Sequence, residues 1–164
     1  MTVYEEELQA AVDCGLVVHE NYYLGNSDAL PDQHLKGLYC NGHIAISDDI
    51  ETMAERRCIL AEEYAHSVTT HGNIMDQAET NNRKQERRAR AYAYDSIIGV
   101  KGIAMALLSG CESSYEVAEY LDITEEFLEE ALDYYHEKYG CYIELDQCDL
   151  YFEPTLLVLP HDGD

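Results

Sequence analysis

The sequence contains no tryptophan, only two phenylalanines and three prolines, and few positive charges. Ten basic residues against 33 acidic ones leave a formal net charge of −23, which argues against direct binding of nucleic acid or an anionic membrane. No stretch approaches the roughly 20 apolar residues that cross a bilayer. The first seven residues hold three glutamates and no base, unlike a secretory signal. We therefore expect a soluble cytoplasmic protein.

Charge is unevenly distributed along the chain. Residues 111–164 carry 16 acids and one base, Lys138, whereas five of the ten basic residues lie between Arg83 and Arg90. Since the chain is long enough for one domain with a small appendage, we expect a core over residues 1–110. An acidic subdomain over residues 111–164 would pack on it.

The six cysteines are widely spaced, and no CxxC pair occurs. Disulfide frameworks are typical of small secreted chains, and zinc clusters of closely spaced ligands. We therefore predict reduced thiols, mostly buried, and no zinc cluster built from these cysteines.

The apolar pattern and the turn residues predict an α+β fold with a small segregated sheet. An Asn-Gly step at residues 41–42 predicts a hairpin of strands 35–40 and 43–46. The helices expected are 4–14, 50–68 capped by Ser47 or Asp48, 83–108 weakened at Gly99 and Gly102, 115–121, and one from Thr124 to residue 139. A short strand at residues 17–18, loops at 20–34 and 71–82, and a strand pair at 141–145 and 150–159 complete the prediction.

The predicted helix 50–68 carries a group of residues suited to metal chemistry. Glu62 and His66 are four residues apart and therefore face the same side of a helix, with Glu63 beside them. This is the geometry of the HExxH zinc helix, with Glu62 in place of the first histidine. The pattern makes Glu62 and His66 candidate metal ligands and Glu63 the candidate general base. The other interpretation is a solvated helix face, on which such a pair is also common.

A third ligand has to come from another part of the chain. Glu86 is the best candidate, because it shares a helix face with the small apolar residues Ala89 and Ala93. The other interpretation is a surface acid paired with neighbouring bases. His71 is an alternative ligand if the helix ends near residue 70.

These residues lie within a longer stretch that resembles the ImmA/IrrE family of metallo-endopeptidases. The resemblance covers about residues 35–158 and rests on the segments 35–46, 57–66, 69–74, 82–93, 115–121 and 151–154. The family's fuller motif has histidine at the position of Glu62. A version with glutamate first is familiar among phage-borne members, usually with Leu-Gly at the positions of Tyr64 and Ala65.

The resemblance implies a minimal zincin-like core in a cytoplasmic protein of a bacterial host. Members act as anti-repressors that cleave or inactivate a helix-turn-helix repressor of the Xre/CI type, encoded by a phage or mobile element. It implies that Glu62, His66 and Glu86 hold a divalent metal, most favourably zinc and alternatively manganese. Glu63 would activate the metal-bound water.

Residues 115–134 have the spacing of a helix-turn-helix, but the second helix carries glutamates where a DNA-reading helix needs basic or amide side chains. We expect either a structural helical subdomain or a surface that recognises a basic protein. This leaves a second function open: a catalytically inactive anti-repressor or antitoxin-like binding protein acting through its acidic surface.

Overall fold

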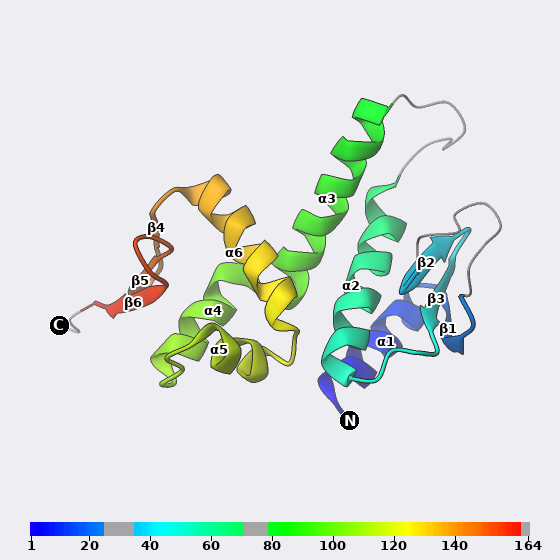
Figure 1. Cartoon of the computed structure of the whole chain (residues 1–164), viewed down its shortest axis with the longest axis horizontal. Coiled ribbons are helices and arrows are strands. Elements are labelled where there is room, and N and C mark those ends of the chain that lie inside the picture. Colours follow the sequence, from blue (N-terminus) through cyan, green and yellow to red (C-terminus); the bar gives the residue numbers. More distant parts are fainter. Residues whose placement is uncertain (25–34, 71–78, 162–164) are drawn as a thin grey trace. The chain divides into compact units, whose positions relative to one another are not determined.

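The computed structural model describes residues 1–24, 35–70 and 79–161, with only the backbone at 79–81. Contacts divide the chain into unit 1, Met1–Ala93, and unit 2, Tyr94–Asp164. Within the described residues there are six helices and two three-stranded sheets (Figure 1), which confirms the predicted mixed α+β class. The boundary falls inside helix α3 (Glu79–Ile97) rather than after residue 110, because α4 (Gly99–Leu108) contacts elements of unit 2.

Unit 1 begins with helix α1 (Val3–Asp13), capped by Thr2, and strand β1 (Val17–Tyr22). The predicted hairpin is confirmed as β2 (Gly37–Cys40) and β3 (His43–Ser47), joined by Asn41 and Gly42 with φ of 48° and 83°. Positive φ at both positions is typical of a type I′ turn. The sheet order is β1-β3-β2, with β1 parallel and β2 antiparallel to β3, so β2 is an edge strand.

Two boundaries in unit 1 differ from the prediction. Residues 20–22, expected in a loop, belong to β1, and residues 25–34 of that loop lie outside the described residues. Helix α2 (Met53–Thr69) is capped by Thr52, not by Ser47 or Asp48. Those two residues are held in the sheet region, because Ser47 pairs with Tyr22 and the Asp48 amide donates to the Tyr22 carbonyl.

The core of unit 1 lies between the sheet and helices α1 and α2. Ile44 and Ile46 of β3 are fully buried against Leu60 of α2. Arg57 of α2 is also buried, and its guanidinium donates to both carboxylate oxygens of Glu7 on α1. This bidentate pair compensates the buried charge and fixes the orientation of α2, the helix that carries the predicted metal ligands.

The single helix expected over residues 83–108 is two helices. Helix α3 begins earlier, at Glu79, within the predicted 71–82 loop, whose residues 71–78 lie outside the described part. It ends at Ile97, and Gly99 has a φ of +63°, which an α-helix does not allow. No single described helix could span a membrane; only α3 from Asn82 and α4, taken together as a bent pair, meet the criteria of length and composition.

Unit 2 follows the predicted order closely. Helix α5 (Ser114–Leu121) is capped by Ser113, Asp122 adopts a left-handed turn, and helix α6 (Glu125–Tyr139) is capped by Thr124. The expected strand pair is an antiparallel sheet of three, β4 (Tyr142–Glu144), β5 (Cys148–Tyr151) and β6 (Leu157–Pro160). The fully buried residues of unit 2 include Ile103, Val117, Leu128, Tyr135 and Leu150.

Candidate functional site

A cavity of about 340 Å³ opens in unit 1 where the edge strand β2 meets α2 and the start of α3. Its described lining consists of Gly37, Leu38, Tyr39, Glu63, His66, Thr70, Asn82, Gln85 and Glu86. The backbone of Gly37 lies close to α2, since a Cβ atom at this position would be 2.5 Å from Ile59 Cγ2 and 2.8 Å from Glu63 Oε1. Glycine therefore allows the strand to approach the side chain of Glu63.

Glu63 is the most electrostatically perturbed residue of this cavity. Burial, and to a smaller extent the neighbouring carboxylates of Glu62 and Glu86, raise the pKa of its carboxyl from 4.5 to about 7. A hydrogen bond from the Tyr39 amide acts in the opposite direction and lowers the pKa. A carboxyl that titrates near neutral pH can both accept and donate a proton, as a general acid-base catalyst must.

His66 and Glu86 meet across the cavity, with His66 Nε2 3.4 Å from Glu86 Oε2. The other oxygen of Glu86, Oε1, accepts a hydrogen bond from Arg90 Nε at 3.1 Å. Ala89 and Ala93 have no exposed surface, as expected for the packed face of this helix, whereas the Glu86 side chain is 49% exposed. Both interpretations of Glu86 thus have support: it faces His66, and it is ion-paired with a base.

Glu62 is placed differently from the other predicted ligands. It is partly buried and acts electrostatically on Glu63, but it is not among the described residues that line the cavity. The described structure thus brings together Glu63, His66 and Glu86, and leaves the role of Glu62 as first ligand a prediction. His71 lies outside the described residues.

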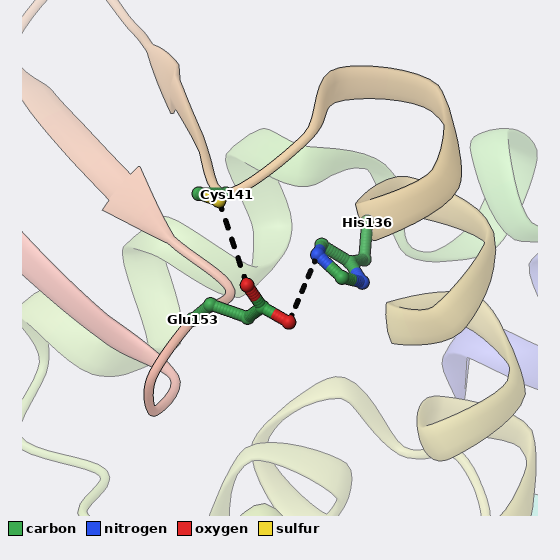
Figure 2. Close-up of side chains that lie close together, drawn as sticks. All are labelled: His136, Cys141 and Glu153. Carbon is green, nitrogen blue, oxygen red and sulfur yellow. Dashed lines mark hydrogen bonds and ion pairs between the residues drawn. The ribbon is translucent and has the colours of Figure 1, made fainter.

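Unit 2 contains a second group of ligand-type side chains, His136, Cys141 and Glu153 (Figure 2). One donor atom from each lies within 4.8 Å of the others, so the three could hold a metal ion. His136 Nε2 is 3.3 Å from Glu153 Oε1, and the Cys141 thiol donates to Glu153 Oε2 at 3.5 Å. This hydrogen bond and the charge of Glu153 raise the pKa of the Cys141 thiol.

We expected no zinc cluster built from the cysteines, and the structure places one of them, Cys141, with His136 and Glu153 in a group that could hold a metal ion. Six free cysteines occur and no two are paired among the described residues, so the predicted reduced state is consistent with the structure. However, Cys14, Cys40 and Cys141 are exposed rather than buried. Spacing could not predict this triad, because His136 and Cys141 are five residues apart and Glu153 lies beyond two strands.

We compared the chain with protein-family models, with curated proteins and with solved structures. None of the three comparisons found a match.

Proposed function

We propose that this protein is a metal-dependent endopeptidase that inactivates a helix-turn-helix repressor, as the resemblance to the ImmA/IrrE family implies. The observation that supports it best is the placement of Glu63. Its carboxyl titrates near pH 7 in a cavity that also contains the facing pair His66 and Glu86. A proton-transferring carboxyl next to two metal-ligand side chains is the arrangement that metal-assisted hydrolysis requires.

The donor set of the cavity suits a divalent cation. His66 and Glu86 offer a nitrogen and an oxygen 3.4 Å apart. The pKa of Glu63 is raised first by burial and then by the negative charges of Glu62 and Glu86, which a cation would offset. His66 and Glu86 would hold the ion, with Glu62 as the proposed third ligand. A bound zinc or manganese ion supplies Lewis-acid activation of the scissile carbonyl and of water. The carboxylates favour manganese more than a histidine-rich site would.

The chain's own residues would then perform the proton transfers and position the substrate. Glu63 accepts the proton of the attacking water and returns it to the leaving amine. The edge of β2, which forms one wall of the cavity, has backbone groups that could pair with an extended segment of the repressor.

The acidic surface of unit 2 suits the binding of a basic repressor. On α6, Glu125, Glu126, Glu129 and Asp133 are exposed. The DNA-reading face of a repressor is basic, so complementary charge would speed its capture and favour the correct orientation. This surface also supports the second candidate function, a binding protein that does not cleave, which the absence of Glu62 from the described cavity lining favours.

Glu63→Gln separates the two functions, since it removes the acid-base group with little change in shape. Purified protein would be incubated with candidate helix-turn-helix repressors, and cleavage and binding would be measured in parallel. The peptidase proposal predicts that Glu63→Gln still binds the repressor but does not cleave it. Glu51→Gln, which changes an exposed acid before α2, should cleave normally. If Glu63→Gln inactivates the repressor as well as the wild type does, the function is binding alone.

A further inference from the structure

The side chains of His136, Cys141 and Glu153 converge from three separate places in the chain of unit 2. His136 lies in the last turn of α6, Cys141 follows the Gly140 that ends this helix, and Glu153 follows strand β5. Figure 2 shows Glu153 between the other two, with one carboxylate oxygen toward each. None of the three belongs to the cavity of unit 1.

The backbone around this triad is held by several interactions. The carbonyl of Cys141 accepts hydrogen bonds from the amides of Phe152 and Glu153, at 2.8 and 3.3 Å. The Gly140 amide donates to the His136 carbonyl at 2.8 Å, which links the end of α6 to the turn that carries Cys141. These bonds set the positions of all three ligand residues before any ion binds, which lowers the entropy cost of binding.

The sequence neighbours of His136 and Glu153 are aromatic residues that pack against each other. Tyr135, the neighbour of His136, is fully buried, and its ring lies 6.4 Å from the ring of Phe152, the neighbour of Glu153. The two rings are nearly parallel, with an interplanar angle of 23°. The ligands at the ends of α6 and β5 are therefore attached to one packed core.

The donor atoms of the three side chains lie close enough together to share one metal ion. Zinc bonds of roughly 2.0–2.3 Å in a tetrahedron place two donor atoms roughly 3.4–3.6 Å apart. The observed separations are 3.3 Å from His136 Nε2 to Glu153 Oε1 and 3.5 Å from Cys141 Sγ to Glu153 Oε2, and one donor atom of each residue lies within 4.8 Å of the others. A nitrogen, a sulfur and an oxygen donor together suit zinc, which accepts all three, better than they suit magnesium or calcium, which prefer oxygen.

We infer that His136, Cys141 and Glu153 form a zinc-binding site that ties the end of α6 to the segment between β5 and β6. Three protein ligands leave the fourth position of the tetrahedron for water. The side chains of His136 and Glu153 are 41% and 55% exposed, so an ion can enter directly from solvent. The 16 acids of residues 111–164 attract cations to this region.

Cobalt(II) tests this inference in the full-length protein, because it replaces zinc in tetrahedral sites and absorbs in the near ultraviolet when bound to a thiolate. The reduced protein would be titrated with Co²⁺ and then with Zn²⁺. We expect a thiolate band that saturates near one Co²⁺ per chain and disappears as Zn²⁺ replaces it. No cysteine lines the described part of the unit 1 cavity, so that site would not produce the band.

Four variants assign the band to the triad. Cys141→Ser should abolish it, and Glu153→Gln should weaken Co²⁺ binding at least tenfold. Cys111→Ser and His161→Gln are matched controls in the same unit, the latter removing a histidine that is also ion-paired with an acid, Asp149. Both controls should retain the band. Circular dichroism before metal addition would show that each variant is folded. Absence of the band in folded wild type, or its persistence in Cys141→Ser, would overturn the inference.

Discussion

The two groups of ligand-type residues differ in how far they are enclosed. In unit 1, Glu63 lies inside a cavity, and burial with nearby carboxylates raises its pKa to about 7. In unit 2, the triad lies at the surface, and its acid and histidine form an exposed ion pair. Enclosure strengthens electrostatic effects and adjusts acid-base groups to neutral pH, whereas an open site offers ligands without such adjustment. We therefore propose chemistry for the first group and metal binding for the second.

The largest expected effect is on repressor cleavage, which should depend on the histidine of unit 1 and not on that of unit 2. His66→Ala removes the proposed nitrogen ligand from the cavity and should reduce repressor cleavage by roughly 100-fold or more. His136→Ala removes the corresponding ligand from unit 2 and should leave the cleavage rate nearly unchanged. Rates would be compared at equal concentrations of folded protein. Equal losses in both variants would contradict the assignment of chemistry to unit 1.

The next prediction concerns the close approach of β2 to α2. In Gly37→Ala, the new Cβ would overlap with Ile59 and Glu63, so strand and helix must separate. We expect a destabilisation of about 1–3 kcal/mol and a loss of cleavage. Gly102→Ala in α4 is the matched control, because its Cβ would meet only Leu121 Cδ2, at 3.3 Å. Chemical denaturation should show a change for Gly102→Ala within about 1 kcal/mol, since alanine favours a helix.

Local signals in the sequence predicted those elements that neighbouring residues determine. Asn41-Gly42 indicated the hairpin because only a few residue types tolerate positive φ at both positions of its turn. Thr124 indicated a helix start for a similarly local reason, a side-chain oxygen that accepts from the backbone three residues on. At α2 the same signal was misleading: Ser47 and Asp48 are suitable caps, but pairing with β1 engages them in the sheet region.

The candidate sites show the same limit. Glu63 and His66 could be grouped from the sequence because helix geometry relates residues three and four apart. Glu86 was predictable through its apolar neighbours Ala89 and Ala93. The alternative interpretation, a surface acid paired with a base, also has support in its ion pair with Arg90. The triad of unit 2 depends on the path of strands β4 and β5 between Cys141 and Glu153, which no local pattern encodes.

A pH dependence should distinguish the enclosed acid from exposed ones. The folded-state pKa of Glu63, about 7, lies above its ordinary value of 4.5. As pH rises from 4.5 to 7, the unfolded state therefore loses this proton before the folded state does, and stability falls until the difference is complete above pH 7. In metal-free protein, Glu63→Gln should lack this loss and gain on the order of 2 kcal/mol relative to wild type over that interval.

Urea denaturation of wild type and Glu63→Gln at a series of pH values would measure this effect. The difference between the two proteins is the useful quantity, because the net charge of −23 makes the stability of both depend on pH. Curves that stay parallel from pH 4.5 to 7 would show that Glu63 is not perturbed in the folded state. Glu51→Gln should follow the wild-type curve, because its side chain is exposed.

The smallest expected effect compares one helix start from each unit. Ser113 and Glu116 form a reciprocal capping box: the Glu116 amide donates to Ser113 Oγ at 3.2 Å, and the Ser113 amide donates to Glu116 Oε2 at 3.1 Å. Thr52 at α2 accepts from the Glu55 amide, also at 3.2 Å, and no reciprocal capping box is formed there among the residues that the structure describes. Ser113→Ala and Thr52→Ala should each cost about 1 kcal/mol. The cost should be greater at Ser113, because losing its hydroxyl also loosens the carboxylate of Glu116, which the Glu112 amide contacts at 2.7 Å. Thermal denaturation of both variants would test this order, and a larger loss for Thr52→Ala would show that packing of α2, rather than its cap, determines the stability of that helix start.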